Sequence, residues 1–326
     1  MKRIENIGVF TSGGDAPGMN AAIRAVVRTG IWEGFEMFGI YRGYQGMIDG
    51  HIEPLYSHSV SNIIQRGGTI LKTARSQQFM TQEGRALAYE QLVKFNINAL
   101  IAIGGNGTFT GATELTKEYD IPVVGLPGTI DNDLYGTDYT IGFDTAINTA
   151  IAAADKIRDT ATSHDRLFFI QVMGRDSGYI ALWSGVACGA EFILVPETKT
   201  YIDNLTRLVK HDIRKNKTSG IVIVAEGDDA GNAETIAAQV KERLPELETR
   251  VTILGHVQRG GSPTASDRML ASILGYASVK ALKDGQKGVM VGMINKQVVF
   301  TPFEEAVKNR KGIILDLLEM SRVLAL

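Results

Sequence analysis

The chain has 326 residues, 44% of them hydrophobic, and a formal net charge of −2. This length allows two domains of ordinary size, and the near-balanced charge argues against a nucleic-acid partner. No apolar run approaches the length of a membrane span, and the first residues lack the apolar core of a signal peptide. We therefore expect a cytoplasmic protein with no membrane contact. The one cysteine, Cys188, lies in an apolar segment and is expected to be a buried small side chain rather than a nucleophile.

Short apolar runs alternate with helical patterns over most of the chain, which is typical of parallel sheets built from β-α-β units. In the first half, the pattern predicts strands at 7–10, 37–40, 99–103 and 121–126, and helices at 20–32, 83–95 and 109–119. From Gly142 onward it predicts further strands at 167–172, 191–195, 221–225 and 251–254. The expected fold class is α/β, with two doubly wound Rossmann-like domains and mostly parallel sheets. The segment 42–76 gives no clear period.

The first strand should end in a glycine-rich turn, Thr11–Gly18, before a helix for which Asn20 is the candidate N-cap. Glycines let backbone N–H groups approach a phosphate, and a helix N-terminus favours negative charge. The turn is neither a Walker A loop nor the dinucleotide fingerprint, which disfavours a Rossmann oxidoreductase. A purely structural turn is the alternative. The run Gly104–Thr108 repeats the arrangement after the strand at 99–103.

A polar loop, Pro127–Asp133, follows another expected strand and brings Thr129, Asp131 and Asp133 to its carboxyl end. Ligand sites of α/β sheets lie at such strand ends, so this loop suits a proton acceptor and groups that hold a hydroxylated substrate. An Asx-rich turn is the alternative reading, because Asp and Asn often serve turns alone. Three glycine-bearing strand ends are expected to converge on one crevice, since glycine weakens folding unless the backbone must approach something closely.

The second half contains further polar strand ends and a candidate phosphate site. Met173–Gly178 forms a glycine turn after the strand at 167–172, and Glu226 follows the strand at 221–225. His256 and Arg259 lie before a helix that begins near residue 263, where both could reach a phosphate. A hydrogen-bonded core residue is the alternative for His256. Arg75, in the earlier segment 42–76, is another candidate phosphate ligand, and an ordinary solvated arginine is the alternative there.

Together these loops resemble those of the bacterial ATP-dependent 6-phosphofructokinases over essentially the whole chain. The matching segments, in order and spacing, are TSGGDAPGMN from Thr11, PGTIDND from Pro127, MGR from Met173 and GHVQRGGSP from Gly255. The resemblance implies the phosphofructokinase fold with discontinuous domains: residues 1–141 plus 257–307 for ATP, and residues 142–256 plus 308–326 for fructose 6-phosphate. It implies a glycolytic kinase that transfers the γ-phosphoryl group of ATP to the 1-hydroxyl of fructose 6-phosphate.

The resemblance also implies roles for individual residues. Asp131 would be the general base, and the catalytic group would be completed by Thr129, Arg175 and Arg75. The expected ATP-binding residues are Gly14, Arg75, Ser76, Gly105, Asn106, Gly107 and Thr108. The expected sugar-phosphate contacts are Thr129, Ile130, Asp131, Arg166, Met173, Gly174, Arg175, Glu226, Arg250, His256 and Arg259. Arg166 and Arg250 resemble arginines that reach the sugar phosphate from a neighbouring subunit, which implies a homotetramer.

The phosphoryl donor and the effectors are also implied by comparison with the family. Pyrophosphate-using relatives carry Asp and Lys where this chain has Gly107 and Gly128, so ATP is the expected donor and pyrophosphate the alternative. An allosteric site for ADP or phosphoenolpyruvate is partly matched by Arg24, Arg28, Arg158, Gly189, Glu191, Lys215 and Lys217. Ser57 and His58 replace an Arg and a Tyr that are frequent in the family, so we expect an effector site of altered strength.

Asn106 is the main departure, because the family usually has at this position an Asp associated with Mg²⁺. One interpretation is an active enzyme whose metal is held by ATP, water, Asn106 and Asp133. The other is a weakened regulatory paralogue, or a silent sensor that binds nucleotide without turnover. Lipid and NAD kinases share a loop similar to residues 104–108, but the loops at Pro127 and Gly255 do not fit them.

Overall fold

The computed structural model describes residues 4–164, 166–214, 219–309 and 311–325. The chain divides into two compact units, and both are discontinuous in sequence. Unit 1 comprises Met1–Ile130, Leu134–Thr145 and Arg259–Lys311; unit 2 comprises Asp131–Asp133, Ala146–Gln258 and Gly312–Leu326. Among the described residues, no helix is long and apolar enough to cross a membrane.

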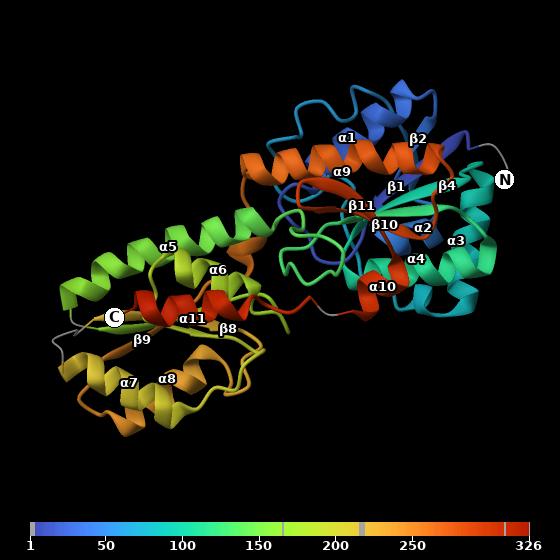
Figure 1. Ribbon diagram of the computed structural model, residues 1–326. Coiled ribbons are helices and arrows are strands. Elements are labelled where there is room, and N and C mark those ends of the chain that lie inside the picture. The colour runs from blue at the N-terminus through green and yellow to red at the C-terminus, as the bar shows by residue number, and fades with distance from the viewer. Residues whose placement is uncertain (1–3, 165, 215–218, 310, 326) are drawn as a thin grey trace. The chain divides into compact units, whose positions relative to one another are not determined.

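Unit 1 is built on a mixed sheet (Figure 1), which within the described residues has seven strands in the order β11-β10-β5-β4-β1-β2-β3. The central strands are parallel, while β3 and β11 run antiparallel at the two edges. The strands are β1 (Asn6–Thr11), β2 (Glu36–Ile40), β3 (Ile52–Leu55), β4 (Ala99–Gly104), β5 (Val123–Pro127), β10 (Val289–Ile294) and β11 (Gln297–Pro302). The chain passes from β1 to β2 on one side of β1 and later enters β4 on its other side. β1 and β4 therefore flank a topological switch point.

Helices cover both faces of this sheet, which explains why β4 and β5 are buried throughout. On one face, α1 (Met19–Trp32) and α9 (Ala265–Lys283) lie side by side (Figure 1), so closely that a Cβ atom on Gly275 would lie 2.7 Å from the Cβ of Ala25. The other face packs Phe10, Phe109 and Phe303 into one core. Its helices are α2 (Gly43–Asp49), α3 (Gln82–Lys94), α4 (Asn106–Tyr119) and α10 (Phe303–Lys308), with a 3-10 turn η1 (Gln78–Met80).

Unit 2 is built on a parallel sheet in the order β7-β8-β6-β9. Its strands are β6 (Leu167–Val172), β7 (Phe192–Leu194), β8 (Gly220–Ala225) and β9 (Thr249–Ile253). Helices α7 (Ile202–Arg214) and α8 (Ala233–Arg243) pack on one face; α6 (Tyr179–Ala187) and α11 (Leu315–Leu324) pack on the other. Helix α5 (Phe143–His164) begins in unit 1, and the 3-10 turn η2 (Gly255–Arg259) follows β9. The predicted fold class, α/β with mostly parallel sheets, is confirmed.

Two sequence predictions about local structure were wrong. Asn20 is not an N-cap, because α1 begins at Met19 after Gly18, and the Asn20 amide donates to the Arg66 and Gly67 carbonyls, each at 3.1 Å. Helix α4 begins at Asn106 rather than at residue 109. The start was missed because the glycine pair before it has a low helix propensity. The segment 42–76 holds α2 and the edge strand β3, which are too short to establish a period.

Candidate active site

The loops after β1 and β4 meet at the switch point of unit 1. The Ser12 N–H donates to the Ile103 carbonyl at 3.0 Å, and the Thr108 hydroxyl donates to the Ser12 carbonyl at 3.1 Å. A Cβ atom on Gly104 would lie 2.2 Å from the Thr108 hydroxyl oxygen, so this approach requires glycine. Two of the glycine loops expected from the sequence are therefore neighbours in space.

The N-terminus of α4 lies within the second of these loops. Gly105 is the N-cap and supplies no side-chain hydrogen bond, and Asn106, Gly107 and Thr108 form the first turn. The Thr108 N–H donates to the Gly105 carbonyl at 3.0 Å, and the helix dipole is positive at this end. This end of α4 is therefore suited to an anion such as a phosphate.

The Pro127–Thr129 segment lies beside the same loop. The Gly128 N–H donates to the Gly104 carbonyl at 3.0 Å, and a Cβ atom on Gly105 would lie 3.6 Å from the Cβ of Thr129. Thr129 and Ile130 are buried, and the Thr140 hydroxyl donates to the Thr129 carbonyl at 2.6 Å. Three strand ends of unit 1 are thus gathered at one edge of its sheet.

The segment that carries Arg75 and Ser76 is attached to the end of β1. The Thr11 hydroxyl donates to the Lys72 carbonyl at 2.9 Å. Arg75 is exposed, as a residue that meets a charged ligand from solvent should be. The Ser76 hydroxyl donates to the Gln45 side-chain oxygen at 2.8 Å and accepts from the Phe79 N–H at 3.1 Å, so this hydroxyl already serves local structure.

Arg259 lies against the first glycine loop. Its Nη1 donates to the Asp15 carbonyl at 3.1 Å, and a Cβ atom on Gly14 would lie 2.4 Å from the same nitrogen. Both residues belong to unit 1. A residue expected from the sequence to contact the sugar phosphate is therefore adjacent to a residue expected to contact ATP.

In unit 2, the loops after β6, β8 and β9 meet at the carboxyl edge of the sheet. The Glu226 carboxylate accepts from the N–H groups of Gly174 at 3.3 Å and Arg175 at 2.8 Å. The Met173 N–H donates to the Gln258 side-chain oxygen at 3.3 Å. Gly174 has φ +141 and Arg175 has φ 54, so the turn between them is held in a left-handed conformation by these contacts. The exposed Arg175 and the neighbouring His256 segment thus share one edge.

Asp131 lies beside the Met173–Gly178 turn. The Ser177 hydroxyl donates to the Asp131 carbonyl at 2.9 Å, and Asp131 is 6% exposed. The following Asn132 has φ 50, a conformation that Asn tolerates better than most residues, and Asp133 is half-buried. The candidate base is therefore next to the residues expected to contact the sugar, as part of unit 2.

Arg166 and Arg250 lie together at the opposite, amino edge of the unit 2 sheet. Glu248 bridges them: Arg166 Nε lies 3.1 Å from its Oε2, and Arg250 Nη2 pairs with its Oε1. The hydrogen bond from Arg166 holds the Glu248 pKa below its ordinary value. The strand β6 separates Arg166 from Met173, a span of roughly 20 Å at the usual rise of a strand.

The expected effector residues form two groups, one in each unit. In unit 2, Arg158 donates to the Cys188 and Gly189 carbonyls at 2.9 and 2.8 Å, and lies 3.5 Å from Glu191. In unit 1, Arg24 and Arg28 are one turn apart on α1; burial, then the charge of Arg28, lowers the Arg24 pKa. Ser57 and His58 are exposed in unit 1, and Lys215 and Lys217 lie outside the described residues. Cys188 is buried, as predicted from sequence.

The oxygen donors available for Mg²⁺ are few. Within the described part of the chain, no three His, Cys, Asp or Glu side chains cluster as a metal site. Asn106 at the start of α4 and the half-buried Asp133 each carry an oxygen donor of the kind that Mg²⁺ prefers. Either donor alone suits an ion that keeps its waters and is bound mainly by substrate phosphates.

Sequence reasoning missed three residues that organise these loops. Ser177 holds Asp131, Gln258 holds Met173, and Asp267 joins the first turn of α5 to α9. Ser177 and Gln258 stand inside the glycine motifs, and their polar side chains were the available signal. Asp267 had no local signal, because its partners are more than 100 residues away in the sequence.

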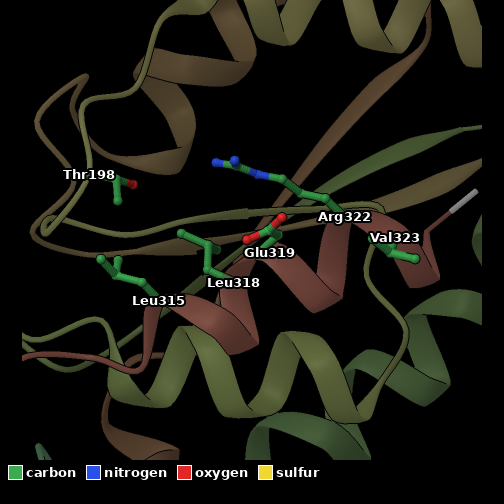
Figure 2. A pocket seen from close by; sticks show the side chains of 6 residues that line it. All are labelled: Thr198, Leu315, Leu318, Glu319, Arg322 and Val323. Atoms are coloured by element: carbon green, nitrogen blue, oxygen red, sulfur yellow. The ribbon is translucent and has the colours of Figure 1, made fainter.

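A shallow pocket of about 510 Å³ lies over α11 in unit 2. Figure 2 shows the Arg322 side chain reaching over it toward Thr198. The pocket is lined by Thr198, Leu315, Leu318, Glu319, Arg322 and Val323. None of the site residues expected from the sequence is among them, so the pocket is separate from the loops described above.

Known proteins of one family are similar to this chain over most of its length. The family model described as phosphofructokinase matches residues 6–282. An ATP-dependent 6-phosphofructokinase 1 of Thermus thermophilus is 59% identical over 99% of this chain and 100% of its own. An ATP-dependent 6-phosphofructokinase 2 of Bacteroides thetaiotaomicron is 54% identical over the full length of both chains.

Two solved structures share the fold. The phosphofructokinase of Saccharomyces cerevisiae has a TM-score of 0.89 and 37% identity, covering 93% of this chain and 45% of the yeast chain. A pyrophosphate-dependent phosphofructokinase of Marinobacter aquaeolei has a TM-score of 0.84 at 20% identity, covering 98% and 91%, and supports the fold alone. Fold and loops define a doubly wound α/β protein with glycine-rich loops at the switch point of unit 1. The chain belongs to the phosphofructokinase family.

Proposed function

We propose that this chain is a glycolytic kinase that transfers the γ-phosphoryl group of ATP to the 1-hydroxyl of fructose 6-phosphate. The products are fructose 1,6-bisphosphate and ADP. The observation that carries the proposal is identity of 54–59% over essentially the whole chain to bacterial ATP-dependent 6-phosphofructokinases. A glycolytic kinase of this kind acts in the cytoplasm, which agrees with the expectation from the sequence.

In this proposal, unit 1 binds ATP. The triphosphate meets the backbone at Gly14 and the N-terminus of α4, from Gly105 to Thr108, where N–H groups and the helix dipole favour negative charge. Arg75 adds a guanidinium, whose planar donors suit phosphate oxygens. Phosphoryl transfer depends mainly on such positioning and charge neutralisation.

Unit 2 binds fructose 6-phosphate, and Asp131 acts as the general base. Its carboxylate accepts the proton of the 1-hydroxyl as that oxygen forms its bond to the γ-phosphorus and the bond to the β,γ-bridging oxygen of ATP breaks. Met173, Gly174, Glu226 and His256 contact the sugar, and Arg175 balances charge on the transferred group. The support is geometric: Ser177 ties Asp131 to the turn that carries Met173 and Arg175.

When bound, Mg²⁺ would neutralise phosphate charge, and Asn106 and Asp133 are the residues that would hold it. A single carboxylate together with phosphates and water is an ordinary Mg²⁺ environment. We therefore favour an active enzyme over a silent sensor.

ATP is favoured over pyrophosphate by the surroundings of Gly107 and Gly128. A Cβ atom on Gly107 would meet no described atom within 4 Å, so this exposed position leaves room for a nucleotide. A Cβ atom on Gly128 would lie 3.0 Å from Ile103 Cγ2 and 3.2 Å from Met19 Cε, so a lysine would have to displace core side chains.

The enzyme is proposed to be a homotetramer in which Arg166 and Arg250 serve a neighbouring subunit. Both lie at the amino edge of the unit 2 sheet, whereas the sugar loops of the same unit follow the carboxyl edge. An arginine side chain does not span the strand between these edges. ADP or phosphoenolpyruvate is the proposed effector, bound by the groups described above and by Lys215 and Lys217.

The test is a coupled assay of the purified enzyme with fructose 6-phosphate and either ATP or pyrophosphate. We expect turnover with ATP and Mg²⁺, and a decrease in kcat of about 10²–10⁴-fold for Asp131→Asn with little change in KM. Product formation with pyrophosphate alone would reverse the donor assignment. Nucleotide binding without any fructose 1,6-bisphosphate would identify a sensor instead.

A further inference from the structure

The Asp267 carboxylate is the most heavily hydrogen-bonded buried acid outside the residues assigned above, among those that the structure describes. It is 1% exposed and lies in the first turn of α9. One oxygen accepts from the Gly142 N–H at 2.8 Å; the other accepts from the Thr145 N–H at 2.8 Å and the Thr145 hydroxyl at 2.5 Å. All of these residues belong to unit 1.

These bonds make the N-termini of α5 and α9 cap each other. Asp267 accepts from the first turn of α5, so it acts as a cap supplied by another helix. In return, the Thr145 hydroxyl accepts from the Thr264 N–H at 3.0 Å, and the Thr264 hydroxyl donates to the Asp144 carboxylate. Thr264 also caps its own helix by accepting from the Asp267 N–H.

One of the proposed ATP-binding loops, the Gly14–Gly18 turn, lies directly against this reciprocal cap. A Cβ atom on Gly18 would lie 2.7 Å from Ile141 Cγ2 and 3.6 Å from Asp267 Cβ, and one on Gly142 would lie 2.6 Å from the Cβ of Ala16. The Gly14–Gly18 turn therefore rests on the segment that Asp267 holds. There is no room for that turn to shift inward without displacing Ile141 or Gly142.

The same segment continues to the strand end that carries Thr129. The Ile141 N–H donates to the Pro127 carbonyl at 2.8 Å, and the Thr140 hydroxyl donates to the Thr129 carbonyl at 2.6 Å. On its other side, α9 follows immediately after the segment that begins with Arg259. The reciprocal cap is thus the common support of the Gly14 turn, the Thr129 strand end and the Arg259 segment.

We propose that Asp267 is a positioning residue that sets the relative placement of these three loops through its hydrogen bonds to Gly142 and Thr145. The proposal rests on the proposed phosphoryl transfer, in which the loops place the triphosphate and the sugar hydroxyl. Only a carboxylate accepts all three donors, because an amide at this position would turn an N–H group toward at least one of them.

The experiment compares four variants of the full-length enzyme, with kcat, KM for both substrates, and thermal stability measured for each. Asp267→Asn and Thr145→Val should lower kcat between about tenfold and a hundredfold, as expected for a small misplacement of reacting groups. Thr145→Ser keeps the hydroxyl and should retain kcat near that of the parent enzyme. Ser278→Ala, a buried change on the same helix whose hydroxyl donates to the Gly275 carbonyl at 2.8 Å, should lower stability without lowering kcat.

A second readout does not depend on turnover. Hydrogen–deuterium exchange without substrate should rise in the segments 12–18 and 128–142 of Asp267→Asn, and not in those of Ser278→Ala. If the parent enzyme lacks kinase activity but this pattern holds, the proposed function fails and the positioning role remains. Parental kcat in Asp267→Asn, or equal losses of kcat in Thr145→Ser and Thr145→Val, would overturn the proposal. If Asp267→Asn does not fold, the two Thr145 variants decide.

Discussion

Asn106 places an amide at the first position of α4, where the family resemblance implies a carboxylate. Asn106→Asp would add a negative charge at the positive end of the helix and beside the proposed metal position. We expect the Mg²⁺ concentration for half-maximal activity to fall severalfold, measured by titrating Mg²⁺ in the coupled assay at fixed ATP. An unchanged Mg²⁺ dependence would remove this residue from the metal site.

Asp267 also gives a prediction about stability and pH. Burial raises the pKa of Asp267 to about 6, although three donated hydrogen bonds act in the opposite direction and the nearby Asp144 adds to the rise. The folded protein therefore binds this proton more tightly than the unfolded chain does. The resulting contribution to stability is present below about pH 4 and is lost as pH rises through about 6.

Asp267→Asn removes this dependence because the amide does not titrate. Between pH 5 and pH 7.5, the unfolding free energy of the parent enzyme should decrease by about 1 kcal/mol relative to the variant. Urea unfolding at several pH values measures the difference, and Ser278→Ala is the matched control. A constant difference across this range would show that Asp267 does not titrate there.

In the proposed function, the N-terminus of α4 determines whether ATP can bind as the phosphoryl donor. Gly107→Asp would place a negative charge in its first turn, where no described atom lies within 4 Å of the new Cβ. Helix propensity and the dipole both favour Asp over Gly there, so stability should rise by about 1 kcal/mol. Repulsion of the triphosphate should raise KM for ATP at least tenfold, because two such charges interact by several kcal/mol at close range.

The neutral variant Gly107→Asn is the control for side-chain size. If it raises KM for ATP as much as Gly107→Asp does, then bulk rather than charge limits the nucleotide. KM for fructose 6-phosphate should stay unchanged in both variants, since Gly107 lies in unit 1. Steady-state kinetics with each substrate varied in turn measures both effects.

Most elements were predictable from the sequence, and the exceptions share a cause. The strand at Leu167–Val172 agrees with its prediction because a continuous apolar run is a local signal. Helix α2 and strand β3 were missed, since each is short and is held by long-range contacts such as the bond from the Tyr41 N–H to the His51 carbonyl. The sequence predicted Asn20 as a helix cap, but its side-chain amide donates to the carbonyls of Arg66 and Gly67, which lie 46 and 47 positions further along the chain.

At the scale of the whole molecule, the proposed tetramer predicts complementation between two damaged chains. Asp131→Asn and Arg250→Ala should each be nearly inactive alone, because one lacks the base and the other lacks a phosphate contact. When the two are co-expressed, a site with Asp131 from one chain and Arg250 from another is intact, so about a quarter of the sites should recover. Turnover per enzyme, measured with the oligomeric state by sedimentation, tests this prediction.

The control pairs Asp131→Asn with the double variant Asp131→Asn/Arg250→Ala, in which no site contains the base. That mixture should stay inactive. If the first mixture is no more active than the average of its components, then Arg250 acts within its own chain or not at all. A monomer in sedimentation would contradict the tetramer directly.

The sequence by itself determined the alternation of strands and helices and the positions of the glycine turns, because hydrophobic period and left-handed backbone are properties of neighbouring residues. Its motifs also identified the family and named residues such as Asp131 and Arg175. Tertiary structure alone decided which loops are neighbours, because strand order brings β1 beside β4 and long-range hydrogen bonds join Asp267 to Gly142. The pairing of Arg166 with Arg250 through Glu248 was likewise invisible in the sequence, since it depends on the register of β6 against β9.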